Sequence, residues 1–251
     1  MAVTGRVALI TGAAYGIGFA TARRLAAEGA TVIVSDVKGH EQAAELLQDL
    51  PGTVVSMRAD VTSDDSVEAV VAAAVERFGS VDILVNNAAI SAELVPGPFE
   101  QASAEDWRRV LEVNVLGVFR MCRAVSPHMR RAKWGRIVNL TSGTAFKGVP
   151  GMLHYVASKG AIISMTRSLA SEFGADNVLV NAVSPGLTMT ESVRSAPELM
   201  AAYANQGAAS RALKRDAVAD DVANAIHFFV TADSAFVTGQ VLAADGGSVF
   251  H

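Results

Sequence analysis

Tyr155 and Lys159 lie four residues apart in the stretch HYVASKGAIISMTRSLASEF, whose pattern predicts a helix. Positions i and i+4 share one face of a helix, so the phenol would lie beside the ammonium group. An unperturbed tyrosine has a pKa of about 10, and a neighbouring positive charge lowers that pKa toward neutrality. The pair therefore predicts a general acid/base. The alternative is an ordinary surface contact between the two side chains.

Two other polar residues could join this pair. Ser142 ends the predicted strand 135–142, and the carboxyl ends of strands are where open α/β sheets bind ligands. Asn114 lies within an otherwise apolar helix, where asparagine has poor propensity and needs partners if it is buried. It is therefore either a structural bridge or part of a proton path.

A glycine-rich turn follows the first predicted strand. Gly12, Gly16 and Gly18 have the spacing G-x-x-x-G-x-G, and the intervening residues include Tyr15 and Ile17. Glycines at a strand-to-helix junction let the backbone approach a pyrophosphate at the helix N-terminus. A tight turn without a ligand would also favour glycine, so this motif alone decides nothing.

Asp36 closes the second predicted strand and suggests which dinucleotide would bind. A carboxylate there accepts hydrogen bonds from the adenosine ribose hydroxyls and repels a 2′-phosphate. Tyr15 is not basic, which also favours NAD over NADP, whereas the nearby Lys38 weakens this preference. Asp60, just before Val61, either accepts from an adenine amino group or caps the following helix.

Polar and flexible segments also follow the fourth and sixth predicted strands. Asn86 and Asn87 come directly after the apolar run of the fourth strand, and asparagine side chains can tie down backbone turns. Pro185 and Gly186 come at the end of the sixth. They introduce a less regular stretch, rich in Met, Ala and Ser, that we interpret as a lid over the site, residues 187–211.

The rest of the chain alternates short apolar runs with longer helical patterns. Such strands are buried on both faces, which predicts an α/β, Rossmann-type, doubly wound parallel sheet of seven strands with helices on both faces. No linker divides residues 1–251, so we expect one domain. The predicted strands are 6–11, 31–36, 53–60, 81–88, 135–142, 178–186 and 240–247, and the main predicted helices are 16–29, 40–50, 63–79, 103–129, 217–232 and the one containing Tyr155.

Composition excludes several functional classes. The net charge is −4 and no basic stripe appears, so nucleic-acid binding is not expected. The single Cys122 excludes an intramolecular disulfide and a cysteine-based metal cluster, and it fits a reducing, cytoplasmic location. No signal peptide and no membrane span are expected, because no apolar run approaches about 18 residues. We expect no metal site.

Taken together, TGAAYGIG, NNAA, Asn114, Ser142, YVASK and SPGLTMT resemble, in order and spacing, the short-chain dehydrogenase/reductase (SDR) superfamily. The resemblance covers nearly the whole chain. It implies that Tyr155 is the general acid/base and that Lys159 lowers its pKa and binds the nicotinamide ribose. It further implies that Ser142 polarises the substrate oxygen and that Asn114 holds a water that relays protons from Lys159.

The resemblance also implies a cofactor site. Gly12, Tyr15, Gly16, Ile17 and Gly18 would line the diphosphate turn, and Asp36 would hold the adenosine ribose. The remaining cofactor contacts would be Asp60 and Val61 at the adenine, Asn87 at the ribose, and Pro185, Gly186, Thr188 and Thr190 around the carboxamide, together with Tyr155 and Lys159.

The function that follows is NAD-dependent hydride transfer between a small secondary alcohol and its ketone, or a related alcohol and aldehyde. The C-terminal half resembles NAD-dependent secondary-alcohol dehydrogenases such as phenylethanol dehydrogenase, and pyridoxal 4-dehydrogenase is nearly as similar. The alternatives are an NADPH-dependent 3-oxoacyl or ketone reductase and a nucleotide-binding regulator without activity. The resemblance also implies a homotetramer.

Overall fold

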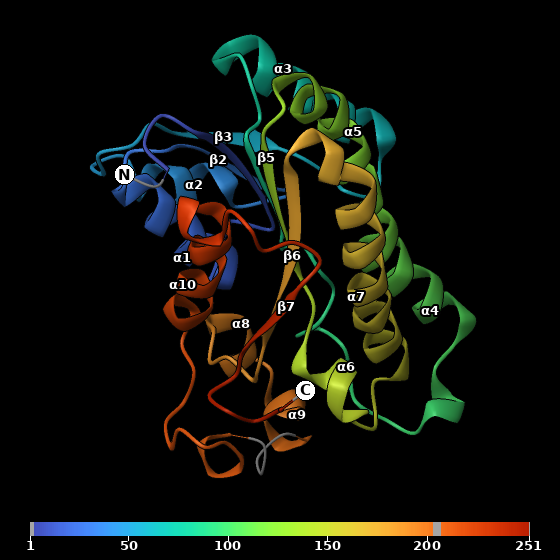
Figure 1. Ribbon diagram of the computed structural model, residues 1–251. Coiled ribbons are helices and arrows are strands. Elements are labelled where there is room, and N and C mark those ends of the chain that lie inside the picture. The colour runs from blue at the N-terminus through green and yellow to red at the C-terminus, as the bar shows by residue number, and fades with distance from the viewer. Residues whose placement is uncertain (1–2, 203–206, 251) are drawn as a thin grey trace.

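The computed structural model describes residues 3–202 and 207–250 and contains one parallel sheet of seven strands in the order β3-β2-β1-β4-β5-β6-β7. The chain builds outward from β1 to β3 and then returns to place β4 on the other side of β1 (Figure 1). The predicted doubly wound Rossmann-type sheet and the single domain are confirmed. The strands are β1 (Val7–Thr11), β2 (Thr31–Asp36), β3 (Val54–Arg58), β4 (Ile83–Asn86), β5 (Gly135–Leu140), β6 (Val178–Pro185) and β7 (Val241–Ala244).

Alternation of side chains along the strands creates two hydrophobic cores, one on each face of the sheet. In β1, Ala8 and Ile10 belong to one core, whereas Val7 and Leu9 belong to the other. Every residue of β1 and β5 is buried and most of them are apolar, as expected for a sheet covered on both faces.

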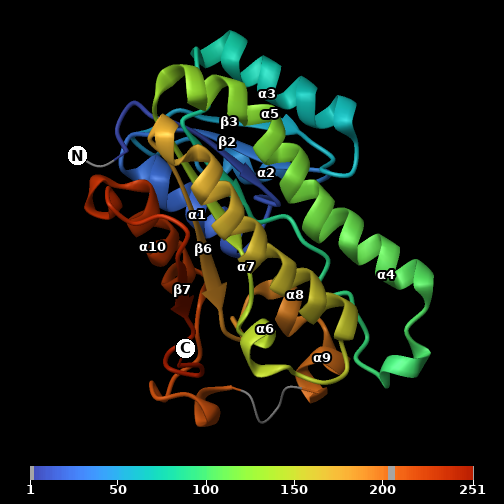
Figure 2. The same cartoon turned by 45° about the vertical axis from the view of Figure 1, so that its right-hand side comes forward.

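Helices cover both faces of this sheet, as Figures 1 and 2 show. One face carries α1 (Gly16–Ala27), α2 (His40–Glu45) and α10 (Ala219–Val230). The other carries α3 (Asp64–Phe78), α5 (Gly117–Ala132), which continues from α4 (Ala104–Leu111), and α7 (Leu153–Phe173). The short helices are α6 (Gly143–Lys147), α8 (Glu191–Arg194) and α9 (Pro197–Ala202), and 3-10 turns occur at Phe99–Gln101, Gly174–Asp176, Ala208–Ser210 and Ala232–Ser234.

Two predicted helices differ from the structure. The helix expected at 40–50 ends at Glu45, because the chain must turn back toward β3, and the Gln48 side chain ties this turn to the carbonyls of Ala44 and Val54. The continuous helix expected at 103–129 is interrupted by a π-helical turn at Glu112–Leu116 and then extends to Ala132. Such π turns often occur at functional sites.

The predicted lid, 187–211, is only partly helical. It contains the short helices α8 and α9 and the 3-10 turn at Ala208–Ser210. Residues 203–206 of this segment lie outside the described part of the chain.

The glycine-rich turn after β1 packs directly against the end of β4. The Asn87 side-chain amide donates to the carbonyls of Thr11 (3.0 Å) and Gly12 (2.8 Å). A Cβ added to Gly12 would lie 2.8 Å from Ala88 Cα, and one added to Gly18 would lie 2.4 Å from the Gly12 oxygen. Two of the three glycines are therefore required by the contact between the turn and the sheet, whether or not a ligand binds.

We predict that Gly12→Ala destabilises the fold by about 1–3 kcal/mol more than Gly148→Ala, because overpacking adds to the backbone strain. The two glycines have nearly equal φ angles, +63° and +64°, but a Cβ on Gly148 would meet no atom within 4 Å. In both variants the new alanine must adopt a left-handed backbone conformation, which costs about 1–2 kcal/mol. Urea unfolding monitored by circular dichroism measures the difference, and equal losses would contradict the crowding at Gly12.

Candidate active site

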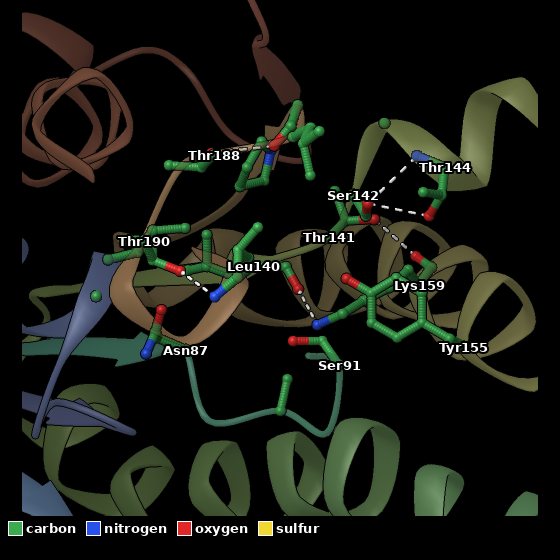
Figure 3. Close-up of a pocket in the computed structure, with 18 of the residues that line it drawn as sticks. Asn87, Ser91, Leu140, Thr141, Ser142, Thr144, Tyr155, Lys159, Thr188 and Thr190 are labelled. Atoms are coloured by element: carbon green, nitrogen blue, oxygen red, sulfur yellow. Dashed lines mark hydrogen bonds between the residues drawn. The ribbon is translucent and has the colours of Figure 1, made fainter. Parts of the chain in front are cut away.

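The main pocket lies where the strands β1, β4, β5 and β6 end, at the point where the strand order reverses. Open α/β sheets bind ligands at such a switch point. Figure 3 shows Ser142, Tyr155 and Lys159 grouped on one side of this pocket, with Asn87 and Thr190 on the opposite side. The predicted site residues that line the pocket are Gly12, Tyr15, Gly16, Ile17, Asn87, Ser142, Tyr155, Lys159, Pro185, Gly186, Thr188 and Thr190.

The Tyr155–Lys159 pair lies on the first two turns of α7, as the spacing predicts. The ammonium nitrogen of Lys159 is 5.8 Å from the centre of the Tyr155 ring. Lys159 is only 4% exposed and donates to the carbonyl of Leu140 at 2.9 Å. Its own carbonyl accepts from the Thr141 hydroxyl at 2.7 Å. The side chain and the backbone carbonyl of Lys159 are thus both hydrogen-bonded to residues at the end of β5.

Ser142 directs a hydroxyl toward the same point. It is the N-cap of α6, and its Oγ accepts hydrogen bonds from the Thr144 backbone N–H (3.2 Å) and the Thr144 hydroxyl (2.9 Å). It is also hydrogen-bonded to the Tyr155 side chain. Because Thr144 supplies two donors, the Ser142 hydroxyl proton is free to point to a ligand or to Tyr155.

The pKa directions differ from the sequence expectation. Burial raises the pKa of Tyr155 above its ordinary value, and the hydrogen bond with Ser142 only partly opposes that shift. Burial also lowers the pKa of Lys159 to about 8. The sequence predicts that the lysine lowers the tyrosine pKa. In the structure, withdrawal from water sets the direction of both pKa shifts.

Asn114 is a structural bridge in the π-helical turn. Its Oδ1 accepts from the Ile90 N–H at 2.8 Å, and its Nδ2 donates to the Ile90 carbonyl (3.2 Å) and to the Ser158 hydroxyl (3.1 Å). The side chain is 1% exposed and all of its hydrogen-bonding groups have partners. The sequence allows either a structural bridge or part of a proton path, and the side-chain hydrogen bonds show the structural bridge.

The residues predicted to hold adenosine lie outside the pocket lining and have their own structural roles. Asp36 accepts from the backbone N–H groups of Ala14 (3.3 Å) and Val37 (2.8 Å), which connects β2 to the glycine-rich turn. Asp60 accepts from the Thr62 N–H (2.9 Å) and hydroxyl (2.6 Å), and these bonds lower its pKa.

Three neighbouring residues also bear on the predicted adenosine contacts. The N-cap of α3 is Ser63, so the helix-cap alternative for Asp60 is wrong. Arg58 is the β3 register partner of Asp36, a basic neighbour that the sequence pattern does not reveal. Val61 packs beside Gly117, at the start of α5.

The segment after β6 contacts the glycine-rich turn. Thr190 is the N-cap of α8, and its Cγ2 would lie 3.4 Å from a Cβ on Gly16. The Thr188 hydroxyl donates to the Gly186 carbonyl at 3.0 Å. The start of the predicted lid is therefore ordered around the entrance to the pocket.

The pocket also contains residues that the sequence does not single out. Met152 lines it and adds apolar surface, whereas Leu153 is 47% exposed. His154 is buried against Trp107, with ring centroids 6.2 Å apart, and does not line the pocket. Asp245 follows β7, so the strand-end rule could have indicated it. The other unforeseen lining residues include Ser91, Thr144, Lys147, Leu187, Val193, Leu199 and Ser248.

Comparison with known proteins decides the family. A family model described as enoyl-(acyl carrier protein) reductase matches residues 12–249. A 3-oxoacyl-[acyl-carrier-protein] reductase, FabG, of Thermotoga maritima is 39% identical over 252 residues, covering 99% of this chain and 100% of the relative.

The chain belongs to the SDR superfamily.

Other SDR relatives differ in what they act on. The cis-4-hydroxycyclohexanecarboxylate dehydrogenase of Sinomonas cyclohexanicum is 39% identical over 243 residues, covering 96% of each chain. The crystal structure of levodione reductase superposes with a TM-score of 0.90 at 34% identity, covering 97% of each chain. As an SDR protein, the chain is an oxidoreductase of a family that binds a nicotinamide cofactor.

The described residues contain neither a cluster of metal ligands nor a membrane-spanning helix. No three His, Cys, Asp or Glu side chains come together there as metal ligands would. Across residues 3–202 and 207–250, no helix combines the length and apolar character needed to cross a bilayer.

We predict that Lys159→Met changes how stability depends on pH. The folded pKa is about 8 and the ordinary value is 10.5, so between these values the unfolded chain binds a proton that the folded protein has released. Stability of the wild type therefore rises with pH in this window, by about 3 kcal/mol relative to the variant. Urea unfolding of both proteins from pH 7 to 10.5 measures this difference. Parallel stability profiles would contradict a depressed lysine pKa.

Proposed function

We propose that this SDR protein is an NAD-dependent dehydrogenase that transfers a hydride between a nicotinamide cofactor and a secondary alcohol or its ketone, or a related alcohol and aldehyde. The observation that supports this most directly is the grouping of Ser142, Tyr155 and Lys159 in the pocket that also exposes the start of α1. The proposed proton-transfer groups and the proposed diphosphate-binding turn thus line the same pocket.

The residues at the start of α1 fit a dinucleotide. The N-cap residue, Tyr15, makes no side-chain capping bond, so the first-turn N–H groups have no side-chain acceptor there. Gly16 and Ile17 belong to that turn and line the pocket. Unpaired N–H groups at the start of a helix bind phosphate well, because they combine with the positive end of the helix dipole.

In alcohol oxidation, the Tyr155 phenolate would accept the hydroxyl proton, and in the reverse direction the phenol would return it. The nicotinamide ring supplies the hydride acceptor when it is bound. Ser142 would donate a hydrogen bond to the substrate oxygen and so stabilise the charge that develops there. Lys159 would hold the nicotinamide ribose and favour the phenolate, and the Asn114 turn would help to pass protons from Lys159 to solvent.

The remaining predicted residues would hold the other parts of the cofactor. We assign the diphosphate to the glycine-rich turn, the adenosine to Asp36, Asp60 and Val61, the nicotinamide ribose to Asn87, and the carboxamide to the segment that starts at Pro185 and Gly186 and includes Thr188 and Thr190. Met152, Val193 and Leu199 would form the apolar wall for the substrate.

The second candidate is an NADPH-dependent 3-oxoacyl or ketone reductase. The positions of Lys38 and Arg58 beside Asp36 favour it, since both could attract a 2′-phosphate. The Asp36 carboxylate opposes this alternative, because its negative charge would repel a 2′-phosphate bound beside it. The third reading, a regulator without activity, has less support, because Ser142, Tyr155 and Lys159 are all present.

We further propose a homotetramer in the cytoplasm. Large apolar side chains are exposed on the outer face of α5 and the preceding turn, where Leu116 is 42% and Phe119 46% exposed, and such surfaces favour association. The single Cys122 is buried and free, which fits a reducing compartment.

We predict that Tyr155→Phe lowers kcat by about 10²–10⁴-fold, the usual contribution of a general acid/base. NADH should still bind within a few-fold of the wild-type affinity, because the ring and Lys159 remain. The assay is NAD⁺ reduction across a panel of secondary alcohols, sugar alcohols, hydroxysteroids and pyridoxal, with NADH fluorescence for binding. Near-normal turnover in a folded variant would contradict the assignment of Tyr155 as the general acid/base.

We predict that Asp36→Ala lowers kcat/KM for NAD⁺ by about 10–100-fold, since a hydrogen bond to a charged group contributes about 1.5–3 kcal/mol. The same change should improve use of NADP⁺, because it removes a negative charge beside Lys38 and Arg58. Asp36→Asn is the matched control, as it removes the charge but keeps an acceptor for the Ala14 N–H. A wild type that prefers NADP⁺ would favour the reductase alternative.

A further inference from the structure

Arg211, at the end of the lid segment, is a buried cation that forms no salt bridge among the described residues. Its side chain is 3% exposed, and its Nη2 donates to the carbonyl of Leu187 at 3.1 Å. The pKa of Asp221 is lowered mainly by its hydrogen bond with Arg215 and more weakly by the charge of Arg211. The buried Nε of Arg211 has no hydrogen-bond partner in the described part of the chain. Burying a charge costs free energy unless it is well compensated, so this arginine calls for an explanation beyond packing.

The backbone around Arg211 is firmly attached to the turn after β7. The next two residues pair with that turn, through Ala212 N–H to Gly247 O (3.1 Å) and Leu213 N–H to Gly246 O (2.9 Å). The Arg211 side chain itself packs on Gly246, where an added Cβ would lie 3.0 Å from Arg211 Cδ. The backbone that carries the Arg211 side chain is therefore fixed where its guanidinium group reaches the Leu187 carbonyl.

Leu187 belongs to the segment that we propose to meet the nicotinamide carboxamide. The segment is held on one side by Ala217, which forms a parallel bridge with Thr188 and accepts from the Met189 N–H at 2.8 Å. Gly186, just before it, lies so close to Asp245 that an added Cβ would be 2.9 Å from Asp245 Cβ. Leu187 and Thr188 both line the pocket.

The planarity of the peptide bond gives the Arg211 contact its consequence. In a trans peptide the carbonyl of one residue and the N–H of the next point in opposite directions. An arginine that holds the Leu187 carbonyl on one side therefore aims the Thr188 N–H to the other side. Arg211 thus helps to set the direction of the N–H of Thr188, a residue that lines the pocket.

We propose that Arg211 is a positioning residue that orients the Leu187–Thr188 peptide for recognition of the nicotinamide carboxamide. This role rests on the proposed nicotinamide-dependent function. Arg211 would then contribute to binding of the nicotinamide part of the cofactor. The glycine-rich turn and Asp36 would bind the ADP-ribose part.

The test compares NADH with ADP-ribose, which has the same diphosphate and adenosine but no nicotinamide. Arg211→Met should weaken NADH binding by about tenfold, roughly the effect of one well-placed hydrogen bond, and should change the dissociation constant of ADP-ribose by less than about twofold. Titration calorimetry measures both ligands. Arg194→Met is the control, because Arg194 is an exposed arginine at the end of α8 in the same segment and should leave both affinities unchanged.

Arg211→Lys provides a second variant that keeps the buried positive charge and can still donate one hydrogen bond. It should lose less NADH affinity than Arg211→Met, again with ADP-ribose unaffected. Equal losses for the two ligands in either variant, or no loss for NADH, would overturn the role of Arg211 while leaving the proposed function intact. A wild-type protein that binds neither ligand would overturn both.

Discussion

The active site depends on one buried contact, the hydrogen bond from the Lys159 ammonium group to the carbonyl of Leu140. This bond attaches α7 to the end of β5 and so places Tyr155 opposite Ser142, which follows that strand two residues later. The arrangement has a cost, because burial disfavours the charged lysine and lowers its pKa to about 8. The protein keeps the charge where folding alone would favour an apolar side chain.

A second set of polar contacts ties neighbouring strand ends together behind the site. The Asn86 amide donates to Asn139 Oδ1 at 2.8 Å, and the Asn139 amide donates to the Thr166 hydroxyl at 3.0 Å. These buried bonds connect β4, β5 and α7 in sequence. Since buried polar groups are costly when unpaired, each of these residues depends on the others, which helps to fix one register between the helix and the sheet.

The sequence predicts the sheet, the order of its elements and the polar group at the centre of the pocket, because these follow from short-range periodicity and from the rule that ligands meet strand ends. Ser142 lies just after a strand end, as that rule predicts, and Tyr155 on α7 and Thr190 at the start of α8 line the same pocket. The π-helical turn at Asn114 could not be foreseen, since its cause is a contact with Ile90 on a separate loop. The pKa direction of Tyr155 was missed for a similar reason, because burial is created by segments far apart in the chain.

The segment between Thr188 and Arg211 is joined to the rest of the fold by backbone hydrogen bonds close to its two ends. Met189 pairs with Ala217 at one end, and Ala212 pairs with Gly247 just after the other. Neither connection uses a residue of the proton-transfer group. Loop grafting between these anchor points would therefore exchange Val193 and Leu199, which pack in the same apolar cluster as Tyr155, and would leave the hydrogen bonds of Lys159 and Ser142 unchanged. The apolar wall and the proton-transfer group are thus held in place by separate sets of hydrogen bonds.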